Sequence, residues 1–147
     1  MKVENMPNGA YVSVMLLITK SDLAPEWVSR ELSLEPVASR VPGALSSFRG
    51  GAGCWMYGVG RVSIASVSEQ LIGLASQLLS RREALAELRE KGYSVQFDIS
   101  YSLEKRATLQ LSPEALLSVR DLGVPLSFTV RYPASKDDSD FFSELGL

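Results

Sequence analysis

The sequence predicts a single α+β domain, in which a mainly antiparallel five-stranded sheet carries helices packed on one face. The chain has 147 residues, which fits one domain of ordinary size. Five segments are rich in β-branched and aromatic residues, and four others repeat apolar residues at helical spacing between start and stop signals. The predicted order is β-α-β-α-α-β-β-α-β. From Cys54 onward it matches the β-α-β-β-α-β order of ferredoxin-like folds.

The first strand and the first helix are marked by their composition. Residues 10–18, AYVSVMLLI, alternate loosely at first and are continuously apolar from Val14, which favours a buried strand. In the helix that follows, Ser21 or Asp22 can cap the first turn and Pro25 suits a first-turn position. Pro36 has no amide hydrogen, so we expect the helix to end before it.

A loop and a second strand come next. Residues 37–53 combine a Pro-Gly turn with serines and glycines, and we expect a long loop that leaves Arg40 exposed. Residues 54–64, CWMYGVGRVSI, read as a strand. Gly58 and Gly60 within it indicate a bulge or a close backbone approach.

Residues 66–92 carry the strongest helical pattern, with leucines on one stripe and Gly92 as a stop signal. One straight helix of this length would span about 40 Å, as much as the domain is wide. The sequence therefore predicts two consecutive helices with a break near Ser80.

The last elements are a hairpin, a helix and a strand. Residues 93–102 and 107–111 alternate at period two, as an antiparallel hairpin would. Ser112 can cap a helix that Gly123 ends, and residues 125–132 form the last strand. The apolar members of 93–102 lie on one face, which we interpret as core, with an aromatic groove as the alternative.

The composition removes most catalytic templates. Histidine is absent and Cys54 is the only cysteine, so one chain forms neither an internal disulfide nor a Cys/His zinc set. Ser-His-Asp and Cys-His catalysis are excluded within the chain for the same reason. We expect no metal, no cofactor and no catalytic residue, and we interpret Cys54 as a small buried apolar residue rather than a nucleophile.

The charge pattern bears on partners and location. With 15 basic and 17 acidic residues the net charge is −2, and no basic patch points to nucleic acid. The longest apolar run, Val14 to Ile18, is far shorter than the ~20 residues that cross a bilayer, and the first ten residues contain no signal core. The expected location is the cytoplasm, with neither nucleic acid nor membrane as a partner.

Several motifs stand in a specific order between Tyr11 and Tyr132. After the early strand come LAPEWVSRELSLEP, a glycine, a strand around Trp55 with glycines before it, LREKGYSVQFDISYS and LSPEALLSVRDLGVPLSFTVRY. In this order and spacing the chain resembles a mostly bacterial family known as a domain of unknown function, number 4279. The resemblance implies no agreed activity, substrate or catalytic residue.

Two candidate ligand sites follow from the residues. The first is the loop from Arg40 to Arg49 with the GGAG that follows it, where exposed backbone amides and two guanidiniums could cradle an anion, although the alternative is a mobile connection. The second is the polar face of the third predicted strand, which is a normal solvated face or a binding surface. Its residues are Gln96, Asp98, Ser100 and Ser102, joined by Thr129 and Arg131 if the last strand is adjacent. A carboxylate pair of Asp98 with Glu104 or Asp121 has no support from spacing.

The chain divides into a domain over 1–133 and an acidic, aromatic tail over 134–147. Phe141, Phe142 and Leu145 in this tail could dock on their own domain or on a partner protein, and the third alternative is plain disorder.

The function expected from these features is a non-catalytic interaction module whose likeliest kind of partner is a protein, with an immunity-type role as one form of it. Self-association through an edge strand is consistent with the low charge of PLSFTVRY. The alternative is a small-molecule or nucleotide-binding domain, or a degenerate enzyme, that uses the Arg40/Arg49 loop and the polar sheet face.

Overall fold

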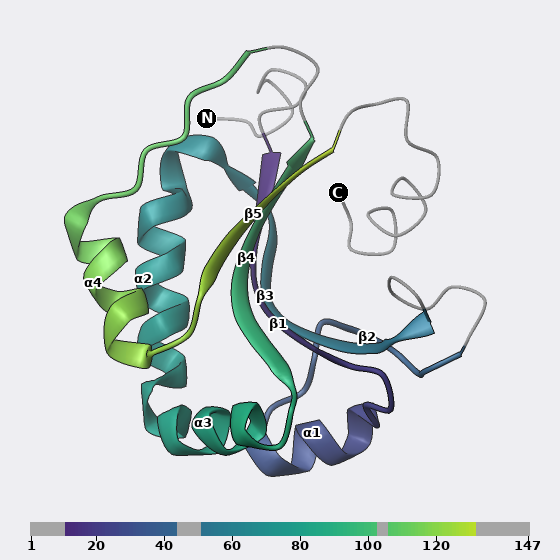
Figure 1. Ribbon diagram of the computed structural model, residues 1–147. Coiled ribbons are helices and arrows are strands. Elements are labelled where there is room, and N and C mark those ends of the chain that lie inside the picture. The colour runs from purple at the N-terminus through teal and green to yellow at the C-terminus, as the bar shows by residue number, and fades with distance from the viewer. Residues whose placement is uncertain (1–10, 44–50, 103–105, 132–147) are drawn as a thin grey trace.

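The computed structural model describes residues 11–43, 51–102 and 106–131. They form a five-stranded sheet with helices on one of its faces (Figure 1). The strands, in their order across the sheet, are β2 (Ala38–Arg40), β3 (Gly53–Ser63), β1 (Tyr11–Lys20), β4 (Ser94–Ser102) and β5 (Leu126–Arg131). The β4–β5 pair is parallel and the other three pairs are antiparallel. The α+β class and the mainly antiparallel five-stranded sheet are confirmed.

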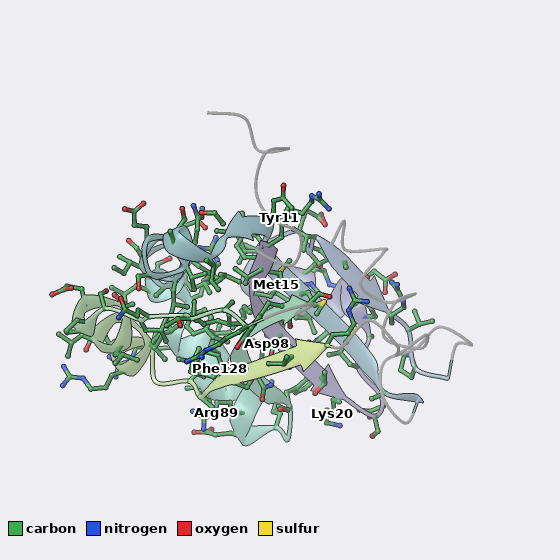
Figure 2. The ribbon with its side chains drawn as sticks, turned by 90° about the horizontal axis from the view of Figure 1, so that it is seen from above. Tyr11, Met15, Lys20, Arg89, Asp98 and Phe128 are labelled. Carbon is green, nitrogen blue, oxygen red and sulfur yellow. The ribbon has the colours of Figure 1, made fainter. Side chains whose placement is uncertain are left out.

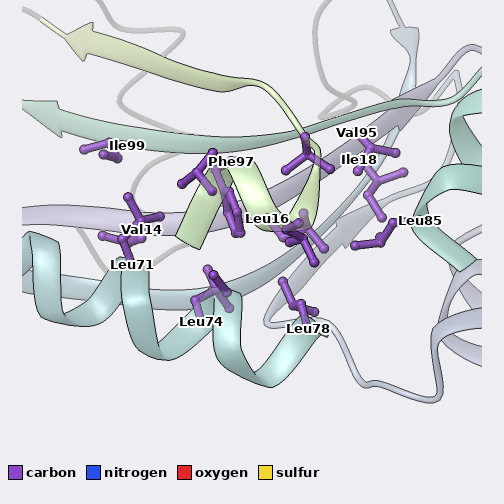
Figure 3. Close-up of a cluster of buried hydrophobic side chains, with 14 of the residues drawn as sticks. Val14, Leu16, Ile18, Leu71, Leu74, Leu78, Leu85, Val95, Phe97 and Ile99 are labelled. Carbon is purple, nitrogen blue, oxygen red and sulfur yellow. The ribbon is translucent and has the colours of Figure 1, made fainter. Parts of the chain in front are cut away.

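The helices cover the sheet through apolar stripes. They are α1 (Pro25–Leu32), α2 (Val67–Leu78), α3 (Arg82–Glu90) and α4 (Pro113–Leu122). Leu71, Leu74 and Leu78 of α2 point at the sheet, where they meet Leu16 of the central strand and Phe97 of β4 (Figure 3). Burial of such side chains contributes about 1.5–3 kcal/mol each, which makes this layer the main source of stability.

The predicted break between the two long helices is confirmed. A 3₁₀ turn, η4 (Leu79–Arg81), separates α2 from α3. The turn directs the side chain of Arg81 to the end of α1, where its Nε donates a hydrogen bond to the carbonyl of Leu32 at 2.6 Å. A helix end leaves carbonyls without intrahelical partners, so this contact joins two helices and satisfies one such group.

Both ends of α4 and the end of α1 before Pro36 are those predicted, whereas the start of α1 differs. Ser112 Oγ accepts a hydrogen bond from Ala115 N–H at 3.1 Å, and Gly123 ends α4 with a φ of 82°. At α1, the capping position is Ala24 and no side chain caps it. Asp22 is instead paired with Lys20, at 2.5 Å. The helix ends at Leu32, four residues before Pro36, because Ser33 adopts the left-handed conformation.

One predicted strand is absent, and a short strand that was not predicted keeps the number of strands at five. Residues 107–111 form no strand, because β1 and β5 already occupy both sides of β4. The predicted β-α-β-β-α-β order therefore loses its hairpin, and from β3 onward the order is β-α-α-β-α-β. In the predicted loop, residues 38–40 form β2, which pairs with Cys54–Met56 of β3. Arg40 is half-buried there instead of exposed.

β3 contains the bulge and the close backbone approach that its glycines predicted. The register between β1 and β3 shifts between Val12 and Val14, and Arg61 at the shift has a φ of 57°. Gly58 has a φ of 154°, and a Cβ added there would lie 2.2 Å from the carbonyl oxygen of Val14. The bulge and the close backbone approach are both present.

Candidate functional site

The candidate site is the sheet face opposite the helices, which we call the far face. Strand residues alternate between the two faces, so the far face takes every second residue from each strand. An apolar half consists of Met15, Leu17, Cys54 and Met56, with Ala38 beside them. A polar half consists of Ser13, Gln96, Asp98, Ser100, Ser127, Thr129 and Arg131. Figure 2 labels Met15 and Asp98 on neighbouring strands, where their Cα atoms are paired in register.

The far face is buried to an unusual degree for a face without helices. Met15 is 2% exposed, Met56 3%, and both Asp98 and Ser100 are 5% exposed. An open antiparallel sheet face alternates polar residues into water, whereas these four residues are almost fully buried and the polar residues of β5 beside them are half-buried. The polar row was predicted as a solvated face or a binding surface, and at its centre it is not solvated.

Asp98 is the centre of a hydroxyl network that joins β4 to β5. Its Oδ1 accepts hydrogen bonds from Ser127 Oγ at 2.7 Å and Thr129 Oγ1 at 2.9 Å. Its Oδ2 accepts a hydrogen bond from Ser100 Oγ. Gln96 Nε2 extends the network by donating to Ser127 Oγ at 3.0 Å. A buried carboxylate is costly unless it is hydrogen-bonded, and these hydroxyls meet that requirement.

Cys54 lies in the apolar half and is 1% exposed. Burial raises the pKa of its thiol, and the neighbouring Arg40 guanidinium opposes that effect only in part. The thiolate, which is the nucleophilic form, is therefore disfavoured at neutral pH. The interpretation of Cys54 as a buried apolar residue is confirmed.

The predicted site residues that the structure describes lie on one face of the sheet but not next to one another. Gln96, Asp98, Ser100 and Arg131 lie together on β4 and β5, whereas Arg40 lies on β2 at the opposite edge. With five strands, the two edges are about 19 Å apart. Arg49, Phe141, Phe142 and Leu145 lie outside the described residues. Sequence reasoning missed Ser127, although its parity with Thr129 and Arg131 on the last strand was a signal that could have found it.

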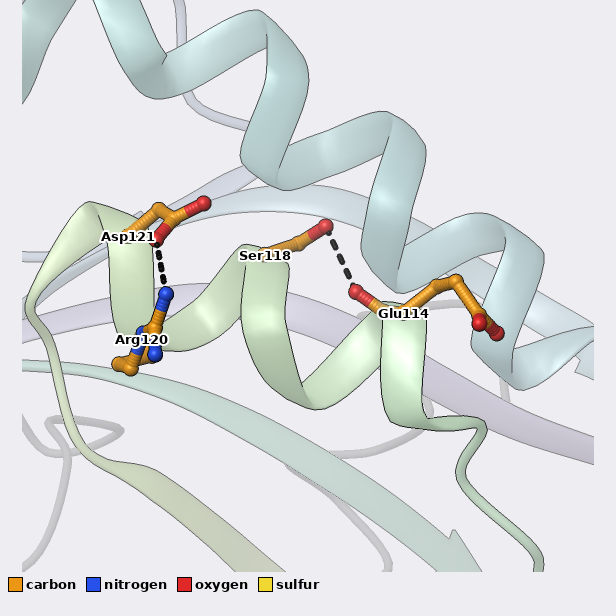
Figure 4. Close-up of polar contacts among 4 residues, drawn as sticks. All are labelled: Glu114, Ser118, Arg120 and Asp121. Carbon is orange, nitrogen blue, oxygen red and sulfur yellow. Dashed lines mark hydrogen bonds and ion pairs between the residues drawn. The ribbon is translucent and has the colours of Figure 1, made fainter.

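Asp98 and Asp121 are not brought together as an acid-base pair. Asp121 lies on the outer layer formed by α4, where it is paired with Arg120 at 3.2 Å (Figure 4). Asp98 lies on the other side of the sheet, and Glu104 is outside the described residues. Among residues 11–43, 51–102 and 106–131, no three acidic or cysteine side chains are grouped as metal ligands.

The outer edge of β5 is the second notable feature. β5 is the last strand in the sheet order, and Phe128 and Val130 on its helix side are 50% and 38% exposed. Phe97 N–H donates to Pro125 O at 2.9 Å, and alternate residues of a parallel ladder face the same neighbour. The backbone groups of residues 126, 128 and 130 therefore point away from β4.

A family model described as "Domain of unknown function (DUF4279)" matches residues 10–132. No curated protein and no solved structure matches the chain. In the part of the chain that the structure describes, every helix is too short or too polar to span a membrane.

Proposed function

The chain belongs to the DUF4279 family, a domain of unknown function, and we propose that it is a non-catalytic module that binds another protein along β5. In this mode an extended segment of the partner adds a strand to the sheet. Main-chain hydrogen bonds supply affinity, and the side chains that alternate along the added strand supply specificity.

The observation that carries the proposal is that no described strand pairs with the outer edge of β5. Sheet edges are usually shortened, charged or covered, because an open edge pairs with other chains. The other edge strand, β2, has three residues, whereas β5 has six, and Arg131 at its end is its single charge. Phe128 and Val130 would contact alternate side chains of the added strand, which should therefore be apolar on that face.

The experiment captures partners from native cell extract on the full chain and on two β5 variants. Val130→Pro removes an outward-pointing N–H and leaves the ladder to β4 in place, and Phe128→Lys places a charge on the apolar edge. Leu79→Lys is the matched control, because Leu79 is 52% exposed but lies on η4. Circular dichroism and the melting temperature verify that each variant folds.

We expect one stoichiometric protein on the wild-type chain and on Leu79→Lys, with loss on both β5 variants. Equal retention on all four chains would refute binding through β5. If the retained protein is the chain itself, light scattering should give a dimer mass that Val130→Pro returns to that of a monomer. If the role is of the immunity type, the retained protein should be basic, and its association rate should fall as the salt concentration rises.

A second candidate is the small-molecule or nucleotide-binding function predicted for the polar face and the Arg40 loop. The hydroxyl cluster around Asp98 favours it, because convergent polar groups are typical of ligand sites. A ligand of the native state raises the melting temperature by mass action. A nucleotide panel should then stabilise the wild type and not Thr129→Val; no shift with any compound would count against this candidate.

We also propose that the protein is located in the cytoplasm of a bacterium. The family resemblance supports the bacterial source, and the lone buried Cys54 suits a reducing compartment.

A further inference from the structure

The polarity pattern of β5 reads the same in both directions about Phe128, which Figure 2 labels on this strand. Leu126, Phe128 and Val130 are apolar and lie on the helix side of the sheet. Ser127 and Thr129, between them, are polar and lie on the far face. A strand with such a pattern is complementary to a second copy of itself that runs in the opposite direction, because each kind of residue then meets its own kind.

We propose that the partner bound along β5 is a second copy of this chain, whose β5 pairs antiparallel with the first about a two-fold axis at Phe128. The inference rests on the proposed function, because it names the occupant of the same edge. The two sheets then form one continuous sheet that carries the helices of both copies on one face. A two-fold contact uses the same patch on both copies, so the assembly closes at two chains.

The backbone directions determine the register of this pairing. The backbone groups of residues 126, 128 and 130 point away from β4. In an antiparallel pair, two such residues that lie directly opposite exchange both hydrogen bonds. With Phe128 opposite its own copy, Leu126 lies opposite Val130 on either side of the axis, and these pairs make about six main-chain hydrogen bonds. An axis at Ser127 or Thr129 would give one pair fewer within β5.

The side chains that meet in this register are compatible. Phe128 is 50% exposed and Val130 is 38% exposed in the single chain, so pairing removes apolar surface from water. Aromatic pairs and apolar pairs directly opposite each other stabilise antiparallel strands. On the far face Ser127 lies opposite Thr129, and both hydroxyls already donate to Asp98. The pairing therefore leaves neither hydroxyl without an acceptor.

The register also keeps like charges apart. Arg131 is the single charged residue of β5, and it lies opposite Pro125 of the second copy. The two copies of Arg131 are then roughly 20 Å apart along the strands. The net charge of −2 per chain adds little repulsion at long range.

The first experiment reverses charges at position 128 and measures the mass by light scattering over a series of concentrations. Phe128→Lys and Phe128→Glu each place two like charges directly opposite at the axis, so we expect each variant alone to be a monomer. An equal mixture of the two should return to the dimer mass of the wild type, because opposite charges then face each other. Circular dichroism verifies that each variant folds.

The matched controls are Leu79→Lys and Leu79→Glu. Leu79 is 52% exposed, similar to Phe128, but it lies on η4 and not on β5. Each control variant alone should keep the dimer mass of the wild type.

Disulfide formation tests the register. Leu126→Cys and Val130→Cys should form a disulfide with each other when mixed, because these positions lie opposite across the pair at a distance that a disulfide spans. Each variant alone should form none, since the same position in the two copies is roughly 14 Å apart along the strands. The native Cys54 is 1% exposed and does not compete.

A wild-type chain that is a monomer at every concentration would overturn the second copy as the partner. The proposed function would survive that result if the β5 variants still lost a different protein in the capture from extract, and would fail with it if they did not. A dimer mass retained by Phe128→Lys would place the contact on another surface. Disulfides within a single cysteine variant would show another register, and either result would overturn the inference.

Discussion

Individual residues show how closely the strands of this sheet approach one another. Gly58 leaves no room for a side chain, since an added Cβ would lie 2.2 Å from Val14 O. Gly73 is different, because it lies on the exposed side of α2 with nothing within 4 Å of an added Cβ. Substitution by alanine should therefore have opposite effects on stability at the two glycines.

We predict that Gly58→Ala destabilises the protein by about 1–3 kcal/mol, because β1 and β3 must separate or the backbone must change. Gly73→Ala should stabilise it by up to about 1 kcal/mol, since alanine is the better helix former. Urea denaturation measures both. Equal effects of the two substitutions would contradict the close approach at Gly58.

Cys54 predicts a dependence of stability on pH. Its pKa is raised by burial in the folded protein, so the unfolded thiol loses its proton first. The contribution of the thiol is complete below the unfolded pKa of about 8.5 and is lost as the pH rises towards the higher folded pKa. The stability difference between wild type and Cys54→Ala should therefore shrink above that pH. Melting curves between neutral and alkaline pH test this, and a constant difference would contradict it.

Among the elements, α1 and α4 start in different ways. Ser112 caps α4 with its side chain, whereas Ala24 at the same position of α1 offers none. Ser112→Ala should cost about 1 kcal/mol, and Ala24→Asp should stabilise by a similar amount at an extended backbone position. Thermal unfolding of the two variants provides the comparison. No gain from Ala24→Asp would show that the first turn of α1 needs no further acceptor.

The parallel pair of β4 and β5 depends on Asp98. Asp98→Ala leaves Ser100, Ser127 and Thr129 without their common acceptor inside the far face, and should cost about 1–3 kcal/mol. Asp121→Asn, at an exposed pair, should change stability by less than about 0.5 kcal/mol. Hydrogen exchange should also show faster opening of β5 in Asp98→Ala. Unchanged protection of β5 against hydrogen exchange in Asp98→Ala would show that the hydroxyl network does not stabilise the pairing of β4 with β5.

At the scale of the whole molecule, one main core carries the stability. Leu16 is fully buried on the central strand, and its replacement by alanine should cost about 2–5 kcal/mol. Leu117→Ala, at a residue 48% exposed, should cost far less. Since a domain of this size is stable by only about 5–15 kcal/mol, Leu16→Ala should lower the melting temperature markedly. Similar melting temperatures for the two variants would argue against a single dominant core.

The sequence by itself determined the class, the helix break at Ser80, the cap at Ser112 and the core side of β4. Each of these depends on local signals, such as apolar periodicity, a capping hydroxyl or a glycine, that act within a few residues. The shared parity of Gln96, Asp98 and Ser100 was likewise visible in the chain.

Only the tertiary structure decided which strands are neighbours. Residues 107–111 alternate like a strand, yet they pair with no described strand, because β5 occupies that side of β4. The same pairing brings Ser127 and Thr129 to Asp98 and leaves β5 at the edge. Strand neighbours are determined by contacts between residues far apart in the chain. Local sequence patterns therefore do not predict which strand will pair with which.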